Sequence, residues 1–304
     1  MRKRIAVAIG DPNGIGPEIA VKAAASYAGG AIEPVLVGDE FVLRHYGAHT
    51  AVHPVAALPR EAFAPGTCDP RAGAATVAYA REAVRLAQAG EVSAIVGCPH
   101  SETAINRAGI RFLGYPGLIA ELTGTPETRV FLMLVAAGLR IAHVTLHESV
   151  SSALGRMSAE LVVEAGRAAV EVVKRLGIAA PRLGVFGINP HAGEDGLFGD
   201  EDERITKPAV ARLKALGIAA DGPAGADLFL SQRRHDVYLA MFHDQGHIPV
   251  KLLSPLRSSA LTIGTPVLFS SVGHGCAYDI AGKGVADPAA VVETLALLGG
   301  VTAR

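Results

Sequence analysis

Two imidazoles, a carboxylate, an amide and an ammonium group lie close together in His243-Asp-Gln-Gly-His247 and the following Lys251. The apolar run 237–242 before them predicts a buried strand. In open α/β sheets, ligands bind where loops leave the carboxyl ends of strands. A loop histidine can also simply satisfy a backbone group, and that interpretation stays open. The density of titratable groups favours half of an active site.

Two further predicted strands also end in loops that contain histidine. One loop reads His143-Val-Thr-Leu-His147 and the other Asn189-Pro-His191. Neutral imidazoles are good ligands for zinc, iron, cobalt or nickel, and three protein ligands leave positions open for a substrate. We therefore predict one metal ligand from each loop, namely His143, His191 and His243. Three unrelated loop histidines are the alternative.

Two of these loops contain a second histidine four positions after the first, a spacing that would place both rings on one face of a helix. Gly246 and Pro249 argue against a helix at the later pair. We expect the second histidines, His147 and His247, to support the metal ligands or face the substrate. Simple surface positions are the alternative for both.

Other predicted strands lead into glycine-rich or polar loops at 10–18, 97–102 and 270–288. Gly14 permits tight backbone geometry and Pro17 suits the first turn of a helix, whose N-terminus can bind an anion or cofactor. The first loop carries neither the Gly-x-Gly-x-x-Gly fingerprint nor a P-loop. The glycines of 270–288 let its backbone approach a flat or phosphorylated ligand, which favours a cofactor or nucleotide loop.

Predicted strands and helices alternate along the chain. Strands are expected near 4–9, 34–37, 92–96, 130–135, 139–144, 183–188 and 237–242, and helices near 17–27, 39–45, 76–88, 158–176 and 205–216. This alternation predicts an α/β fold with a mostly parallel sheet and helices on both faces.

The composition bounds the class of protein. The chain has 304 residues, of which 50% are hydrophobic, enough for two lobes or one large unit. Its 28 basic and 29 acidic residues give no net field that would attract nucleic acid or an anionic membrane. The three cysteines are widely spaced and contain no Cys-x-x-Cys metal pair. With neither a secretory leader nor a long apolar run, we expect a soluble cytoplasmic protein.

The loop His274-Gly-x-Ala-x-Asp-Ile-Ala-Gly-Lys-Gly-x-Ala-x-Pro288 resembles the cofactor loop of the isocitrate and isopropylmalate dehydrogenase superfamily. The motifs Gly-Asp-Pro-Asn-Gly-Ile-Gly-Pro-Glu, Asn-Pro-His-Ala-Gly-Glu and His-Asp-Gln-Gly narrow this further. Across nearly the whole chain, the sequence is similar to the 4-hydroxythreonine-4-phosphate dehydrogenase family.

The resemblance implies two α/β/α lobes with mostly parallel sheets and an active-site cleft between them. Residues 1–127 with 262–304 would form the lobe of the cofactor loop, and residues 128–261 the lobe of the metal histidines. It also implies a homodimer whose subunits share the metal site. The family's three metal histidines correspond to His143, His191 and His243, and a substrate-contacting lysine to Lys251.

Several positions depart from the pattern of the phosphate-substrate enzymes. Their His-Thr pair is replaced here by Tyr115-Pro116, their substrate-contacting Asn by Ala260 and their Arg by Phe269, while the Asp of Thr-Ser-Val-Asp-His-Gly is Gly273. Loss of a bidentate arginine removes the group best suited to a phosphate dianion. We expect Phe269 to present an apolar ring face to a flatter, unphosphorylated substrate.

The motifs Cys98-Pro-His-x-Glu-Thr-Ala-Ile and Ser270-Ser-Val-Gly-His-Gly resemble the branch of this family that oxidises terephthalate 1,2-cis-dihydrodiol. The resemblance implies a decarboxylating dehydrogenase of aromatic catabolism that uses NAD and one divalent metal (Zn, Fe, Co, Mn or Mg). The product would be 3,4-dihydroxybenzoate and the partner a small carboxylate substrate.

The expected roles follow from this interpretation. Lys251 is the candidate for binding a substrate carboxylate, and Asp244 for orienting a metal ligand or acting as a base. His100, Tyr115 and His247 are further candidate substrate contacts. The expected cofactor-binding residues are His274, Gly275, Ala277, Asp279, Lys283 and Gly14.

Three alternatives stay open. A 4-hydroxythreonine-4-phosphate or sugar-acid 4-phosphate dehydrogenase would fit the family but not Phe269 and Ala260. A metallohydrolase would use the histidines and leave the loop 274–283 unexplained. A non-catalytic binding protein would have little use for so many polar loops at strand ends.

Overall fold

The computed structural model describes residues 2–301, which form two compact units. The first unit contains the chain up to Gly124, then 256–260, and then the chain from Pro266 onward. The second contains Thr125–Pro255 and Leu261–Thr265. The predicted lobe boundaries differ from these units at residues 125–127, 256–260 and 262–265.

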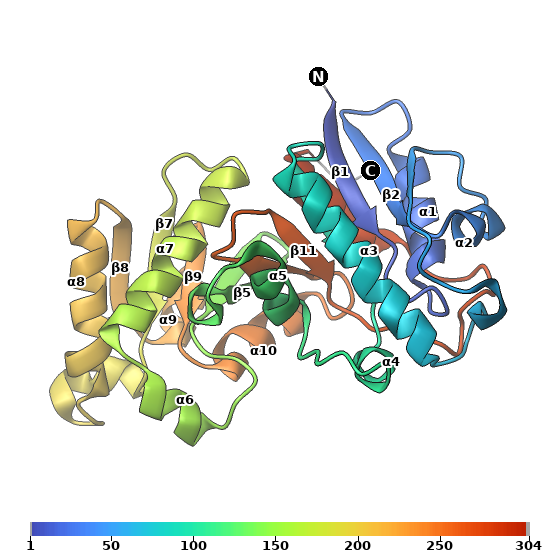
Figure 1. Cartoon of the computed structure of the whole chain (residues 1–304). Helices are drawn as coiled ribbons and strands as arrows, with labels where there is room; N and C mark the ends of the chain where they lie inside the picture. The colour runs from blue at the N-terminus through green and yellow to red at the C-terminus, as the bar shows by residue number, and fades with distance from the viewer. Residues whose placement is uncertain (1, 302–304) are drawn as a thin grey trace. The chain divides into compact units, whose positions relative to one another are not determined.

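The first unit is built on five parallel strands in the order β3-β2-β1-β4-β11. Helices α3 and α1 cover opposite faces (Figure 1), and α11 packs with α1. The strands are β1 (Lys3–Ala8), β2 (Ile32–Gly38), β3 (Val52–Pro54), β4 (Ala94–Gly97) and β11 (Phe269–Val272). The helices are α1 (Gly16–Ser26), α2 (Glu40–His45), η1 (Arg60–Ala62), α3 (Pro70–Gln88), α4 (Glu102–Arg107), α5 (Tyr115–Thr123) and α11 (Ala289–Gly299).

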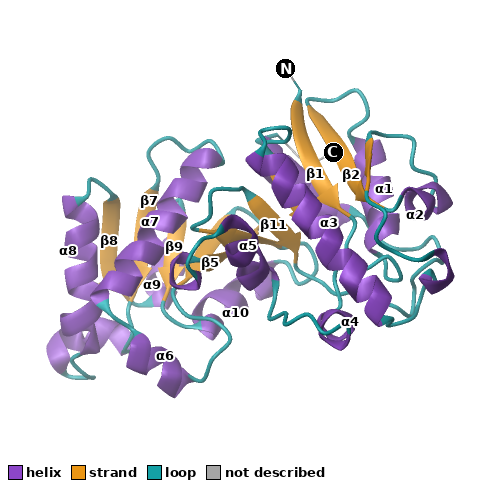
Figure 2. Cartoon of the chain, viewed as in Figure 1, coloured by secondary structure: helices purple, strands orange, loops and turns teal. Residues whose placement is uncertain are grey.

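The second unit has the strand order β5-β6-β9-β7-β8, in which only β5 is antiparallel to its neighbour. Helix α7 packs against one face and α10 against strands of the same sheet (Figure 2). The strands are β5 (Phe131–Ala136), β6 (Leu139–His143), β7 (Arg182–Phe186), β8 (Ala219–Ala224) and β9 (Val237–Ala240). The helices are η2 (Glu127–Arg129), α6 (Val150–Arg156), α7 (Ala159–Arg175), η3 (Pro190–Gly196), η4 (Asp202–Thr206), α8 (Lys207–Ala215), α9 (Ala226–Gln232) and α10 (His243–Leu253). Strand β10 (Ser259–Ile263) begins in the first unit and ends in the second.

Each unit has its own apolar core. Ile5, Leu36 and Ile95 are fully buried in the first, and Ile141 and Leu239 in the second. Burying a side chain of this size stabilises the fold by roughly 1.5–3 kcal/mol. Strands covered on both faces read as continuous apolar runs, which is why the sequence marks them clearly. Within residues 2–301, no helix has the length and apolarity needed to cross a lipid bilayer.

Helix α7 forms where the sequence predicts a helix. The Ser158 hydroxyl accepts a hydrogen bond from the Leu161 amide at 3.2 Å, and Gly177 follows the helix with φ +104°. Apolar residues at helical spacing, including Val162 and Val173, are buried along one stripe. The predicted hairpin of β5 and β6, with its turn at Ala137-Gly138, is also confirmed.

Helix α10 corrects the expectation that Gly246 and Pro249 exclude a helix after β9. Both residues lie inside the helix. The Gln245 side chain accepts hydrogen bonds from the amides of Met241 and Phe242, at 2.9 and 3.2 Å, and so caps the first turn. Position 246 requires a glycine, because a Cβ there would clash with the ring of His143. Tertiary packing thus outweighs the helix propensity of these two residues.

Candidate active site

The histidine-bearing loops leave three neighbouring parallel strands at one edge of the second unit. His143 is the last residue of β6, His243 follows β9 at the start of α10, and His191 lies in the loop after β7. Strand β9 pairs with β6 on one side and β7 on the other. The expectation that these loops occupy equivalent topological positions is therefore confirmed.

His143 is fully buried, and both of its ring nitrogens are engaged. Nδ1 lies 3.2 Å from the Leu132 carbonyl oxygen and must donate to it, which leaves a lone pair on Nε2. That nitrogen lies 3.1 Å from Nδ1 of His247, which therefore donates. Burial, and next the neighbouring His247, lower the pKa of His143 to about 3. The imidazole is neutral at physiological pH, as a metal ligand must be.

His243 and His247 lie one turn apart on α10, and their rings stack at 3.7 Å with an interplanar angle of 13°. His243 Nδ1 donates to the Asp244 carboxylate at 2.7 Å, which in the neutral ring places the lone pair on Nε2. A carboxylate in this position fixes the orientation of a ligating imidazole. Burial is the main reason that the pKa of His247 falls to about 4. His147 is exposed, and its ring centroid lies 5.6 Å from that of His243.

His191 lies in a left-handed turn. Residues 191–195 all have positive φ, although only Gly193 is a glycine. A non-glycine residue costs roughly 1–2 kcal/mol in this conformation. The buried Asp202 carboxylate supports the turn by accepting hydrogen bonds from the amides of Ile188 and Asn189, both at 2.9 Å. Its role was missed in the sequence, where nothing distinguishes Asp202 from the acidic residues around it.

The structure brings together only two of the three predicted metal ligands, His143 and His243. Contacts link His143, His243 and His247, and no contact within residues 2–301 links His191 to them. Within residues 2–301, no group of three His, Cys, Asp or Glu side chains is arranged to hold a metal ion. The donor chemistry still suits a divalent transition metal, because imidazole nitrogens are good ligands and Nε2 is the free ring nitrogen of His243 and the lone-pair nitrogen of His143. For His143 to bind an ion through Nε2, His247 must release that nitrogen.

Two further features of the second unit lie close to these histidines. A cavity of about 300 Å³ is lined by Thr145, Leu146, His147, Glu148, Val150, Ala153, Phe242, His243 and Asp244. Lys251 lies one turn beyond His247 on α10, and burial lowers the pKa of its ammonium group. A partly desolvated ammonium is a suitable partner for a carboxylate ligand.

The first unit also collects its functional loops at the carboxyl ends of parallel strands. The loop after β1 packs directly on the loop after β11, since the Ile15 amide donates to the Cys276 carbonyl at 2.9 Å. The Tyr278 hydroxyl donates to the buried Asp11 carboxylate at 2.7 Å. Gly14 contacts Cys276 so closely that no Cβ could be added. Loop packing therefore explains why position 14 is a glycine.

Glu18 and Lys22 on α1 hold the distal part of the cofactor-type loop. The Glu18 carboxylate, which is 3% exposed, accepts hydrogen bonds from the amides of Gly284 and Ala286 at 3.3 and 2.9 Å. Lys22 bridges Glu18 and the carbonyl groups of the same two residues. Neither residue was predicted from the sequence; a glutamate just after Pro17, on the buried face of a helix, is the signal that marks Glu18.

A cavity of about 420 Å³ opens beside this loop. It is lined by Ile15, Leu256, Arg257, His274, Gly275, Ala277, Ile280, Asp287 and Ala290. Three of the predicted cofactor residues, His274, Gly275 and Ala277, are thus among its walls. Asp279 and Lys283 are exposed and are not, and neither is Gly14. The mostly apolar walls with a few polar groups suit a flat ring such as a nucleobase.

His100 and Tyr115 are brought together, with ring centroids 4.5 Å apart. Tyr115 is buried, and its hydroxyl donates to the Cys98 carbonyl at 3.2 Å. Phe269 is fully buried behind Tyr115, at 4.8 Å between centroids. The expectation that Phe269 offers an open ring face is therefore wrong, because strand β11 directs this side chain into the core. Tyr115 likewise presents little surface for a substrate to contact.

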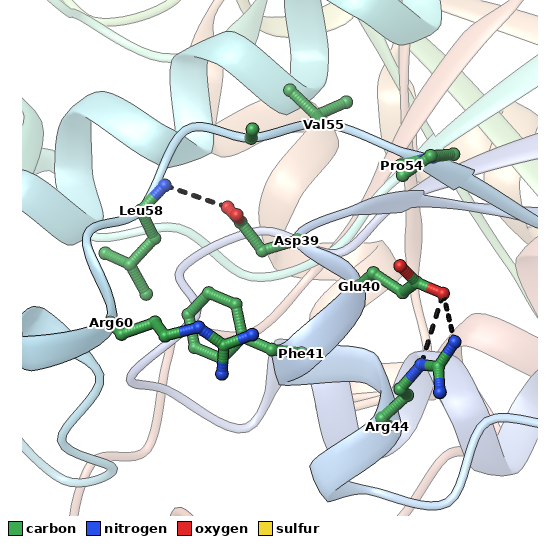
Figure 3. Close-up of a pocket in the computed structure, with 9 residues that line it drawn as sticks. Asp39, Glu40, Phe41, Arg44, Pro54, Val55, Leu58 and Arg60 are labelled. Carbon is green, nitrogen blue, oxygen red and sulfur yellow. Dashed lines mark hydrogen bonds and ion pairs between the residues drawn. The ribbon is translucent and has the colours of Figure 1, made fainter.

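Another hollow, of about 510 Å³, lies at the end of β2 (Figure 3). Asp39 follows this strand, where an acid could bind a ribose in other nucleotide-binding folds. Here its carboxylate accepts hydrogen bonds from the Leu58 amide at 2.9 Å and from the Tyr79 hydroxyl at 2.5 Å. The guanidinium of Arg60 lies over the Phe41 ring at 4.6 Å. Asp39 thus has a structural role, and the cofactor-type loop lies elsewhere in the unit.

The class of protein follows first from the fold. The chain is similar to a β-decarboxylating dehydrogenase from Thermococcus kodakarensis with a TM-score of 0.54 at 17% identity, covering 97% of this chain and 82% of the other. At this identity the likeness shows the fold alone. The predicted α/β architecture of the isocitrate and isopropylmalate dehydrogenase type is confirmed.

The family follows from closer matches. The family model "Pyridoxal phosphate biosynthetic protein PdxA" matches residues 16–298, and the chain belongs to this family. It is 51% identical to a 1,2-dihydroxy-3,5-cyclohexadiene-1,4-dicarboxylate dehydrogenase of Comamonas sp, over 98% of both chains. It is 40% identical to a D-threonate 4-phosphate dehydrogenase of Cupriavidus necator, over 96% of this chain and 95% of the relative.

A solved structure gives the same result. The crystal structure of a terephthalate 1,2-cis-dihydrodiol dehydrogenase from Burkholderia xenovorans matches with a TM-score of 0.80 at 50% identity, covering 99% of this chain and 98% of the other. The family resemblance stated from the motifs is confirmed.

Proposed function

We propose that the chain oxidises terephthalate 1,2-cis-dihydrodiol with NAD and releases carbon dioxide to give 3,4-dihydroxybenzoate. The observation that carries the proposal is the 51% identity, over nearly the whole of both chains, to a dehydrogenase of this diol dicarboxylate. The chain is accordingly a decarboxylating dehydrogenase of the PdxA family that functions in aromatic catabolism.

His143, His191 and His243 are the residues that would hold a divalent metal, with Asp244 orienting His243. His274, Gly275 and Ala277 would contact NAD, and we propose Asp279, Lys283 and Gly14 as further cofactor-binding residues of the same loop region. When bound, the metal would supply Lewis acidity at the substrate oxygen, and NAD would accept the hydride. We also propose a homodimer that shares the metal site, as the family resemblance implies.

The proposed reaction requires side chains that accept and donate a proton at the substrate oxygen. The hydroxyl that is oxidised must lose its proton, and the phenolate formed when carbon dioxide leaves must gain one. A single group can therefore accept the proton during the oxidation and return it after the decarboxylation. Asp244, exposed and bonded to His243, is the candidate for this transfer, while Lys251 binds a substrate carboxylate.

The second candidate function is dehydrogenation of a 4-phosphorylated substrate, which the 40% identity to a D-threonate 4-phosphate dehydrogenase favours. Against it, the buried Phe269 takes the position where the phosphate enzymes carry an arginine. A metallohydrolase or a non-catalytic binding protein would leave the loop at 274–286 without a role.

One assay separates these functions. Metal-replete protein and NAD are mixed with the cis-dihydrodiol, with D-threonate 4-phosphate or with 4-hydroxythreonine 4-phosphate. NADH is followed by absorbance and products by chromatography. We expect NADH and 3,4-dihydroxybenzoate from the diol alone. Turnover of a phosphorylated substrate instead would establish the second candidate, and no NADH from any substrate would contradict both.

A further inference from the structure

His100 lies where the loops of the first unit converge. It follows β4 in Gly97-Cys-Pro-His100, at the carboxyl edge that also carries the cofactor-type loop. The carbonyl of Pro99, the residue before His100, accepts a hydrogen bond from the Asp11 amide at 2.9 Å. The Asp11 carboxylate in turn accepts one from the hydroxyl of Tyr278 in that loop, at 2.7 Å. The backbone that carries His100 is thus tied to the loop predicted to bind NAD.

Two aromatic rings fix the imidazole of His100. The Tyr115 ring contacts it edge to face at 4.5 Å, and the Phe112 ring does so at 4.9 Å. Tyr115 is itself held by its hydrogen bond to Cys98 and by Phe269 behind it. Gly97 makes room for both of these rings. We call Phe112, Tyr115 and Phe269 the aromatic collar. It leaves the imidazole little freedom to turn.

The nitrogens of this ring have no protein partner. No hydrogen bond to either nitrogen exists within residues 2–301, and neither is sealed from solvent as an unpaired buried atom. Burial alone lowers the pKa of His100 to about 4, with no charged neighbour contributing. His100 therefore presents one N–H donor and one lone pair, without net charge, to a ligand at the strand edge.

We propose that His100 determines substrate specificity by donating a hydrogen bond to the ring carboxylate that the product retains. This role rests on the proposed function. The reaction alters the diol carbons and the carboxylate beside them, which leaves the carboxylate at the opposite end of the ring as a constant group to be recognised. Because that carboxylate is charged in both substrate and product, a neutral hydrogen-bond donor binds it equally in both states and does not raise the reaction barrier. The aromatic collar contains no cationic side chain that could pair with a phosphate dianion.

The test compares two substrates across variants. One is the dicarboxylate diol, and the other is the cis-diol monocarboxylate that lacks the carboxylate retained in the product. We expect wild-type kcat/KM to favour the dicarboxylate by about tenfold or more, as for a hydrogen bond to a charged group. His100→Phe should bring this ratio close to one, mainly by raising KM for the dicarboxylate, while the monocarboxylate is oxidised as before. His100→Gln, which keeps a donor, should retain part of the preference.

His49→Phe is the matched control, because His49 is exposed in the same unit and lies outside the collar. It should keep the wild-type ratio. If His100→Phe does not give a folded protein by circular dichroism, His100→Leu replaces it. An unchanged ratio, or an equal fall in kcat for both substrates, would overturn the role of His100 alone. A wild-type enzyme that oxidises neither diol would overturn the proposed function and this role with it.

Discussion

His191 differs from the other predicted metal ligands in how it is held. His143 and His243 are fixed by the sheet and by α10, whereas His191 depends on a left-handed turn supported by Asp202. The motif Asn-Pro-His made His191 visible in the sequence. The strained backbone around it could not be foreseen, since four of the five residues in that turn are not glycine.

Replacing His191 with Ala should lower turnover at least about 100-fold and reduce bound metal, while the fold is retained. Turnover, metal content by elemental analysis and the circular dichroism spectrum check this. Asp195→Ala is the control, because Asp195 lies in the same turn with its side chain 99% exposed. Near-normal turnover and metal content in His191→Ala would remove His191 from the ligand set.

The buried, neutral state of His100 has a consequence for stability. Its pKa is about 4 in the folded chain and about 6.5 when unfolded. As the pH falls below 6.5 the unfolded chain binds a proton that the folded chain does not, so stability is lost on acidification. This loss amounts to about 2 kcal/mol at pH 5.

His100→Asn should therefore lose about 2 kcal/mol less stability than wild type between pH 7 and pH 5. Urea unfolding at the two pH values measures the difference. His49→Asn, on the exposed surface, should follow wild type. Equal pH dependence in His100→Asn and wild type would show that the imidazole titrates normally in the folded protein.

Residues of chemically rare type can be recognised in the sequence, whereas burial cannot. The histidines and the cofactor-type loop are recognisable because few folds need such groups at strand ends. Phe269 occupies a position where related enzymes carry an arginine, which favours a ring face open to the substrate until the structure shows it buried. Which way a strand directs one side chain depends on the register, and the chain alone does not give that with certainty. Glu18 and Asp202 were missed because buried acids look like surface acids in a sequence.

At the scale of elements, α10 joins the histidine positions to the core. Its propensity is poor, with glycine and proline inside it, yet Gly246 is required because His143 occupies the space of its Cβ. Local rules gave the strand–helix alternation correctly and failed at this one functional helix. That is where packing around a site competes with propensity.

Gly246→Ala should destabilise the protein by about 1–3 kcal/mol, although alanine favours helices, because the methyl group overpacks against His143. Metal content should fall as well. Gly155→Ala in α6 is the matched control: nothing lies within 4 Å of its added Cβ, and it should gain up to about 1 kcal/mol. Urea midpoints measure both changes. A Gly246→Ala protein as stable as wild type would show that His143 can move aside.

At the scale of the whole molecule, the predicted metal and NAD sites belong to different units. The predicted metal ligands His143, His191 and His243 are all in the second unit, and the 420 Å³ cavity is lined by the first. The alternation of strands and helices predicted a mostly parallel sheet, and most strand pairs in each unit are parallel. The exact points at which the chain passes from one unit to the other could not be read from composition, because the segments 256–265 are short and carry no distinctive linker sequence.

Removing divalent metal with a chelator should abolish turnover and leave the Kd for NAD within about twofold, because separate units supply the two sets of residues. Enzyme assays and calorimetric titration of NAD measure the two effects. Adding back Zn, Fe, Co, Mn or Mg singly should restore activity and identify the metal. Full activity after chelation, or loss of NAD binding with it, would contradict this division of labour.

The first unit is discontinuous in the chain, and this bears on how the protein is made. Its strand β11 and helix α11 follow the second unit in the chain and are synthesised after it, and α11 buries Val291 and Leu295 in contact with β1, β4 and α1. The amino-terminal segment of the first unit therefore exposes an apolar face while the second unit is synthesised. Truncated products of interrupted translation would carry that face into the cell as a target for chaperones and proteases.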